Sequence, residues 1–144
     1  MKEQKPCYVT IVNSQLEELE QLKDTNMLEK NQSRLCQLLR SRYNFKVTET
    51  ILTYIRDIQV PTDGLLVAVL GLLRNTLLYY DARILAAEAL VSMICNQKNT
   101  KKREMQEKLV QQTMSSLIES SHPSRFRDVL LTSVPATREH LPVK

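Results

Sequence analysis

Basic side chains gather toward the C-terminal end of this sequence. Eight basic and five acidic residues lie between Thr100 and Lys144, whereas the two signs nearly balance in the rest of the chain. Closely spaced ammonium and guanidinium groups are the chemistry that binds phosphate oxygens. Six side chains make up this candidate phosphate-contacting patch: Lys101, Lys102, Arg103, Lys108, Arg125 and Arg127. Glu104 and Glu107 interrupt the run, so an ordinary solvated helix face is the competing interpretation.

Groups suited to catalysis are scarce. The chain has two histidines, His122 at a predicted helix break and His140 in a predicted tail, and neither has an evident partner to orient its ring. The sequence contains no HExxH, GxGxxG, GxSxG or Walker-type motif, and its two glycines cannot form a glycine-rich phosphate cradle. We therefore predict no enzymatic activity and no cofactor.

The cysteines point to neither a metal site nor a redox pair. They are widely separated and show no CxxC spacing: Cys7, Cys36 and Cys95. An odd number of scattered cysteines is typical of a reducing compartment. The longest apolar run, Leu65 to Leu73, falls short of the roughly 20 residues that cross a bilayer. We expect an intracellular protein, cytoplasmic or nuclear, with no membrane association.

The elements that must position these residues are predicted to be helices. A chain of 144 residues with 42% hydrophobic residues, two glycines and no tryptophan favours a single all-α domain. Apolar residues recur at helical spacing in about six to seven segments. The predicted helices begin near Ser14, Asn31 or Ser33, Thr48, Leu65, Asp81, Thr100 and Pro123. The fourth is expected to run from Leu65 to Leu78, and the fifth, rich in alanine, to be central.

Both ends of the chain are predicted to differ from this helical domain. Ser14 and Glu17 have the spacing of a capping box, and the residues from Cys7 to Val12 have high β propensity. We therefore expect an N-terminal arm over residues 1–13 and a helical domain over residues 14–134. Pro135 is expected to end the last helix, which leaves a disordered tail over residues 135–144.

One segment resembles a known class of helical repeat. The sequence from Asp81 to Leu90, Asp-Ala-Arg-Ile-Leu-Ala-Ala-Glu-Ala-Leu, is similar to the start of the second helix of a HEAT or armadillo-type repeat. A weaker echo follows about 42 to 44 residues later, from His122 to Leu131, within the expected repeat period. The resemblance implies a short right-handed stack of helical hairpins, an α-solenoid. It also implies a scaffold that presents one face to a protein or peptide and has no catalytic residues.

Two functions from different classes follow as hypotheses. The first is a protein-binding adaptor, whose candidate contact residues are Arg74, Tyr79, Tyr80, Arg83 and Glu88. For each of these, a structural role is the competing interpretation: Arg83 as a tie between neighbouring repeats, and the two tyrosines as packing at a helix corner. The second hypothesis is a nucleic-acid-associated protein that uses the basic patch. The sequence leaves open whether the chain self-associates or is a short relative of a longer repeat protein.

Overall fold

The computed structural model describes residues 8–40, 45–119 and 124–139, and over these residues the chain is entirely helical. The seven α-helices are α1 (Tyr8–Asp24), α2 (Gln32–Arg40), α3 (Phe45–Tyr54), α4 (Asp63–Arg74), α5 (Tyr80–Asn96), α6 (Thr100–Ile118) and α7 (Ser124–Glu139). Two 3₁₀ turns, η1 (Glu29–Asn31) and η2 (Ile55–Asp57), precede α2 and follow α3. The prediction of an all-α domain with six to seven helices is confirmed.

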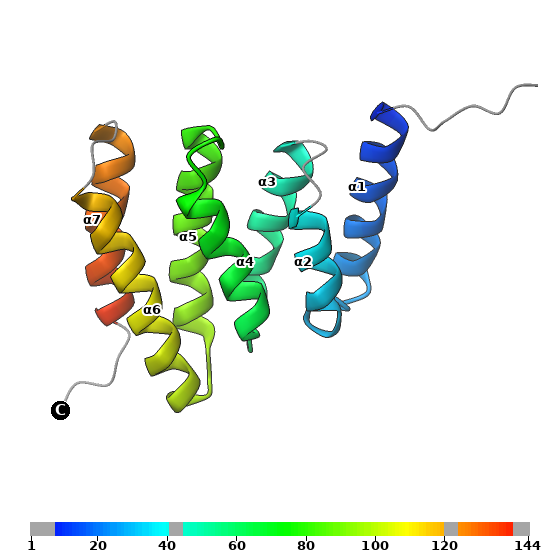
Figure 1. The fold of residues 1–144 in the computed structure, drawn as a ribbon. Helices are drawn as coiled ribbons and strands as arrows, with labels where there is room; N and C mark the ends of the chain where they lie inside the picture. The colour runs from blue at the N-terminus through cyan, green and yellow to red at the C-terminus, as the bar shows by residue number, and fades with distance from the viewer. Residues whose placement is uncertain (1–7, 41–44, 120–123, 140–144) are drawn as a thin grey trace, which may run out of the picture.

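The helices stand in a row and form two layers (Figure 1). In one layer α1, α3, α5 and α7 contact one another in succession, and in the other α2, α4 and α6 do so. Each helix of the second layer also packs against helices of the first, as α4 does against α5 and α6 against α7. None of the helices described is long and apolar enough to cross a membrane.

The core lies between the two layers, and α5 is at its centre. This helix contacts α3, α4, α6 and α7, as its alanine-rich sequence predicts. Ala86, Ala87 and Ala89 are fully buried, so small side chains let the neighbouring helices approach closely. Leu90, Met93 and Ile94 fill the remaining space on the same helix. Burial of these apolar side chains is the main stabilising contribution to such a fold.

Three buried glutamines tie the helices to the connection that precedes α4. We call Gln32, Gln97 and Gln106 the glutamine network. The side-chain amide of Gln32 donates to the Val60 carbonyl at 3.1 Å, and its oxygen accepts from the Thr62 amide at 2.8 Å. Gln97 and Gln106 donate to the Pro61 carbonyl from the other side, at 2.9 and 3.4 Å. The network thereby gives hydrogen-bond partners to backbone groups of Val60, Pro61 and Thr62, which lie outside the helices.

The N-terminal helix begins earlier than predicted. It starts at Tyr8 instead of Ser14, so residues 8–13 of the expected arm belong to α1, and residues 1–7 lie outside the described residues. Val12 and Leu19 are both buried and lie seven residues apart, on one face of the helix. Packing of this face outweighs the local β propensity, which depends strongly on context.

Three other helix ends differ in detail from the predicted ones. The third helix begins at Phe45 and includes Thr48, which is buried. The fourth ends at Arg74 because the Asn75 side chain accepts from the Leu77 amide at 2.9 Å, which favours a turn over a further helical turn. The fifth begins at Tyr80, with Asp81 in its first turn, where a carboxylate interacts favourably with the helix dipole.

The last helix continues through the proline that was predicted to end it. It runs to Glu139, so residues 135–139 are helical and are not part of a disordered tail. A proline inside a helix removes one backbone hydrogen bond and crowds the carbonyl four residues earlier, but its fixed φ is a helical value, so the residues beyond Pro135 can still continue the helix. Residues 140–144 lie outside the described residues.

Candidate functional site

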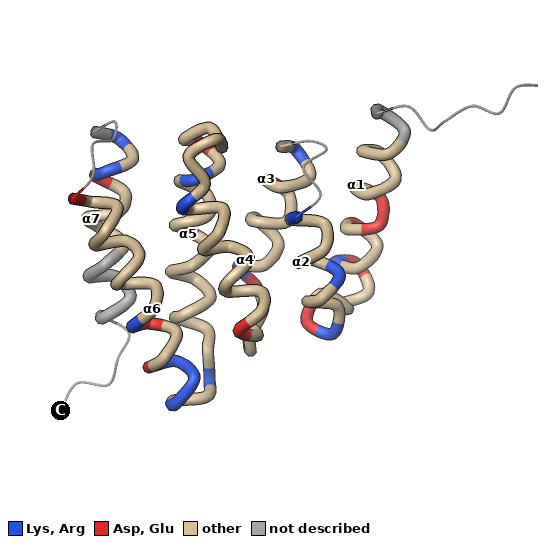
Figure 2. The backbone as a smooth tube through the Cα atoms, viewed as in Figure 1, with Lys and Arg blue, Asp and Glu red and all other residues tan. Residues whose placement is uncertain are grey.

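The structure separates the candidate phosphate contacts into two groups. Lys101, Lys102 and Arg103 lie at the beginning of α6, whereas Arg125 and Arg127 lie at the beginning of α7. The two helices pack side by side and run in opposite directions, so the groups stand at opposite ends (Figure 2). The 15 residues between Arg103 and the end of α6 correspond to roughly 20 Å. The six side chains therefore do not form one continuous patch.

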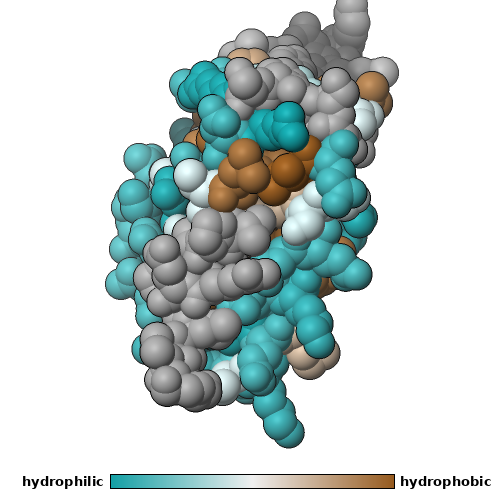
Figure 3. Space-filling model, turned by 90° about the vertical axis from the view of Figure 1, so that its left-hand side faces the viewer, coloured by the Kyte–Doolittle hydropathy of each residue, from teal (hydrophilic) through white to brown (hydrophobic). Residues whose placement is uncertain are grey.

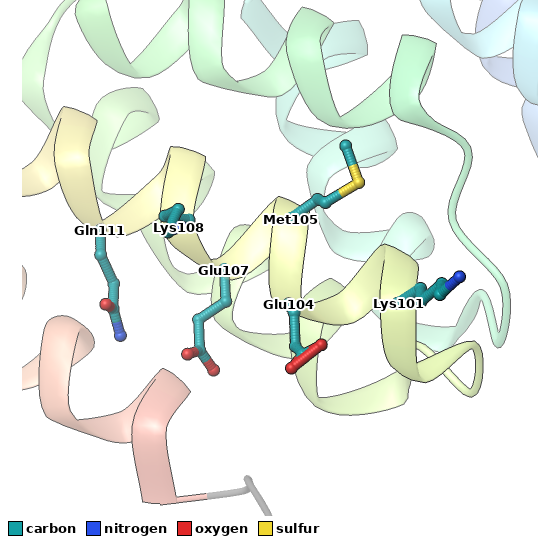
Figure 4. A pocket seen from close by; sticks show the side chains of 6 residues that line it. All are labelled: Lys101, Glu104, Met105, Glu107, Lys108 and Gln111. Atoms are coloured by element: carbon teal, nitrogen blue, oxygen red, sulfur yellow. The ribbon is translucent and has the colours of Figure 1, made fainter.

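Both basic groups also have acidic neighbours. Arg125 Nη1 lies 3.3 Å from an Asp81 carboxylate oxygen in an exposed ion pair. Lys101 and Lys108 line a surface hollow of about 530 Å³ along α6, together with Glu104, Met105, Glu107 and Gln111. In Figure 4, Glu104 and Glu107 point to one side of the helix, and Met105 points to the other. This mixture of charges weakens the electrostatic case for a phosphate site.

The five candidate protein contacts are also dispersed. Arg74 ends α4 and is exposed, whereas Glu88 is half-buried in the middle of α5. The two tyrosines of the corner differ from each other. Tyr80 is half-buried, with its ring 5.1 Å from that of Phe126, whereas Tyr79 is 38% exposed.

Arg83 is buried, and its contacts are internal. It is 1% exposed, and its Nε donates to the Leu73 carbonyl at 2.8 Å, near the end of α4. Its guanidinium carbon lies 5.0 Å from the Tyr80 ring centroid and 4.7 Å from that of Phe126. Burial lowers the pKa of Arg83. The expectation that Arg83 projects toward a partner is therefore corrected: it ties α5 to α4 and α7, through groups other than a carboxylate.

Tyr79 belongs to an exposed apolar cluster that sequence reasoning missed. Its ring meets that of Phe45 edge-on, with centroids 5.2 Å apart, and its hydroxyl donates to the Glu49 carboxylate. Burial, followed by this hydrogen bond and the nearby negative charge, raises the pKa of Tyr79. Phe45 is 56% exposed and Leu77 is 87% exposed. Large apolar side chains that gather at the surface of a protein indicate an interaction site.

These side chains surround a hollow of about 290 Å³ where the ends of three helices meet. We call it the corner hollow; it is lined by Leu39, Phe45, Thr48, Leu72, Asn75, Leu77, Leu78 and Tyr79. The residues come from α2, α3, α4 and the turn before α5, which are up to 40 residues apart in the sequence. The sequence contains one indication of this hollow, because Leu77 and Leu78 continue an apolar run beyond Asn75, a residue type that often ends a helix.

Comparison with known proteins gives no family for the chain. No protein-family model matches it, and neither a curated protein nor a solved structure does. The candidate site must therefore be interpreted from its own geometry.

A second apolar surface lies at the α6–α7 end of the row. Figure 3 looks onto this end, where a group of hydrophobic atoms lies next to hydrophilic ones. Leu131 of α7 is 50% exposed. The corner hollow is lined by Leu39 and Phe45, on either side of residues 41–44, which the structure does not describe.

The described residues hold no arrangement suited to a metal ion, since no three of their His, Cys, Asp or Glu side chains lie together. Cys36 is buried and Cys95 is half-buried, and burial raises the pKa of both thiols. His122 and His140, the two histidines considered for catalysis, lie outside the described residues.

Proposed function

We propose that this chain is a non-enzymatic interaction module, an adaptor or scaffold that binds another protein. The observation that carries the proposal is the corner hollow with its exposed rim of Phe45, Leu77 and Tyr79. Apolar and aromatic side chains around a pocket are the usual centre of a protein–protein interface. Intracellular function, in the cytoplasm or nucleus, is part of the proposal and rests on the scattered cysteines.

The proposed architecture is a short right-handed α-solenoid of the armadillo or HEAT type. Two observations support it: the alternation of helices between two layers, and the repeat-like spacing of the segments at Asp81 and His122. In such an arrangement each hairpin buries its apolar face against the next, and the stack leaves a long surface for a partner.

Affinity purification of the tagged chain, with nuclease treatment and mass spectrometry, tests the interaction function. We expect a protein partner that survives nuclease and moderate salt. Leu77→Asp should abolish its recovery, whereas the control Val67→Asp, at an exposed valine of α4, should retain it. Recovery that disappears with nuclease, or with Lys101→Glu and Lys102→Glu, would instead support nucleic-acid binding.

A further inference from the structure

The helix at one end of the row, α1, is held by few buried side chains. It packs mainly against α3 (Figure 1). Of its residues 11–24, whose side chains the structure describes, Val12 and Leu19 are buried, and Leu16 and Leu22 are half-buried. The shorter helix α4 buries five apolar side chains. Because the free energy of packing scales with the apolar area buried, α1 is held less firmly for its length than α4.

The polar contacts between α1 and its neighbours are exposed. Arg34 of α2 pairs with Glu18 at 2.7 Å, and the two side chains are 42% and 35% exposed. Lys23 Nζ lies 4.7 Å from the centroid of the Tyr54 ring of α3. Such contacts contribute little where water reaches them. In contrast, α2, α5 and α6 each bond to the connection before α4 through the buried glutamine network, to which no described residue of α1 contributes.

One buried polar atom of α1 is unsatisfied while the helix is docked. Gln15 Oε1 is shielded from solvent and has no hydrogen-bond partner among the described residues. A buried acceptor without a partner destabilises the state that buries it, because water would otherwise bond to that acceptor. Movement of α1 away from the rest of the molecule would return this oxygen to water.

Two hollows flank the docked helix. One, of about 370 Å³, lies between α1 and α3, where Leu16 and Glu20 face Thr50 and Tyr54. The other, of about 290 Å³, lies beside the turn that follows α1, and its lining includes Asn26. Side chains that border a hollow lose packing contacts on that side. The packing around α1 is therefore incomplete both along the helix and at its C-terminal end.

The turn after α1 is closed by bonds within the turn itself. The Met27 amide donates to the Leu22 carbonyl at 2.8 Å, and the Asn26 amide donates to the Lys23 carbonyl at 3.1 Å. This pair of bonds is a Schellman motif, which places one residue in the left-handed region, and Asn26 has a φ of 57°. The C-terminus of α1 is thus capped without help from α3, and the dihedral angles of Asn26 set the direction of the helix.

We propose that α1 is a detachable cap, which undocks from α3 as a unit about Asn26 while α2 to α7 stay folded. The few buried side chains, the exposed polar contacts, the unsatisfied Gln15 oxygen and the locally closed turn all favour this movement. Undocking uncovers the side of α3 that carries Thr50 and Tyr54, so the position of α1 controls the exposure of that side. The device is separate from the corner hollow, which no described residue of α1 lines.

Hydrogen exchange of the full chain, measured by mass spectrometry of proteolytic fragments, tests the inference. We expect the amides of α1 to exchange about a hundredfold or more faster than those of α5, because local opening costs less free energy than global unfolding. Fragments along α1 should share one weak dependence on urea, whereas those of α5 should show a strong one, since α5 opens only with the whole fold.

Two results of this experiment would overturn the inference. Equal protection and equal urea dependence in α1 and α5 would mean that α1 opens only when the whole chain unfolds. Protection that rises steadily along α1, with a different urea dependence for each fragment, would indicate fraying of the helix instead of undocking as a unit.

Matched variants test the assigned causes. Gln15→Leu removes the unsatisfied oxygen and should slow exchange of α1 about fivefold or more, whereas Gln21→Leu, at an exposed position of the same helix, should change it less than about twofold. Asn26→Val should speed this exchange about fivefold or more, because a β-branched residue disfavours the left-handed region, and Asn26→Gly should not. Exchange of α5 should stay unchanged in all four variants, which verifies that the rest of the chain is folded. Equal effects of Gln15→Leu and Gln21→Leu, or of the two Asn26 variants, would contradict the proposed undocking.

Discussion

Replacement of Gln106 by leucine removes the hydrogen bonds that hold α6 to the connection before α4. The Gln106 side chain is 2% exposed; it donates to Asp63 at 3.0 Å and to the Pro61 carbonyl at 3.4 Å, and it accepts from Gln97 at 3.1 Å. Leucine is similar in volume, so the change leaves little cavity. Because a buried hydrogen bond contributes about 1 kcal/mol and an unpaired buried group costs about 1 to 3, we expect Gln106→Leu to lower the free energy of unfolding by about 1 to 3 kcal/mol.

The pair Gln97 and Gln106 provides a sharper test than either residue alone. Gln97→Leu leaves the Gln106 side-chain oxygen without the hydrogen bond that Gln97 donates to it. Gln106→Leu removes one acceptor of the Gln97 side-chain amide, which still donates to the Pro61 carbonyl at 2.9 Å. The double variant removes both partners of the shared bond. Its destabilisation should therefore be smaller than the sum of the single effects, by about 0.5 to 3 kcal/mol.

Urea unfolding followed by circular dichroism at 222 nm measures these differences, with an unchanged dependence on urea as evidence for a common unfolded state. Gln112→Leu is the matched control, because Gln112 lies on the same helix and is exposed. It should change stability by less than about 0.5 kcal/mol. Strict additivity of the two buried substitutions, or equal effects of Gln106→Leu and Gln112→Leu, would refute the assigned role of the network.

Three further predictions concern buried and paired groups. Arg83→Ala should destabilise the fold by about 2 to 4 kcal/mol, because it leaves a cavity and a bare helix-end carbonyl, and Arg83→Lys should not fully restore stability; thermal unfolding measures both. Arg34 binds Glu18 at 2.7 Å and lowers the pKa of that carboxyl. Glu18→Gln should therefore lower the free energy of unfolding by about 0.2 to 1 kcal/mol near pH 7. This difference in stability between the two chains should vanish as pH falls from 4.5 through the lowered pKa, because Glu18 then becomes protonated. The Cys36 thiol, whose pKa is raised, should resist a disulfide reagent at pH 8 until urea is added; rapid labelling of the native chain at Cys36, identified by mass spectrometry, would contradict its burial.

Much of the fold could be predicted because the apolar spacing of the helices is strong. Leu35, Leu38 and Leu39 recur on one face of α2, and the alanines of α5 indicate a central helix before any coordinates are known. The errors lie at the helix ends. There the outcome depends on tertiary contacts, such as the packing of Val12 in α1, or on side-chain hydrogen bonds, such as that of Asn75.

The candidate site was less predictable, for two physical reasons. Residues that are close in sequence can lie far apart when consecutive helices run in opposite directions. The basic residues of α6 and α7 stand at opposite ends because the two helices are antiparallel. Conversely, the corner hollow joins Leu39, Phe45 and Leu77, which no short motif connects. The glutamine network was missed because glutamine ordinarily indicates an exposed position, and its burial depends on backbone groups that only the folded chain presents.

Among the described residues of the corner hollow, Leu77 is the one whose substitution best tests binding without affecting folding. At 87% exposure it gains almost nothing from the core, whereas Tyr79 beside it is held by Phe45 and Glu49. The rim is thus preorganised by residues that also support the fold, and preorganisation lowers the entropy cost of binding. Leu77→Asp should leave the free energy of unfolding unchanged within about 0.5 kcal/mol. Loss of a partner in that variant would then identify the corner as a contact surface, because no change in stability could account for it.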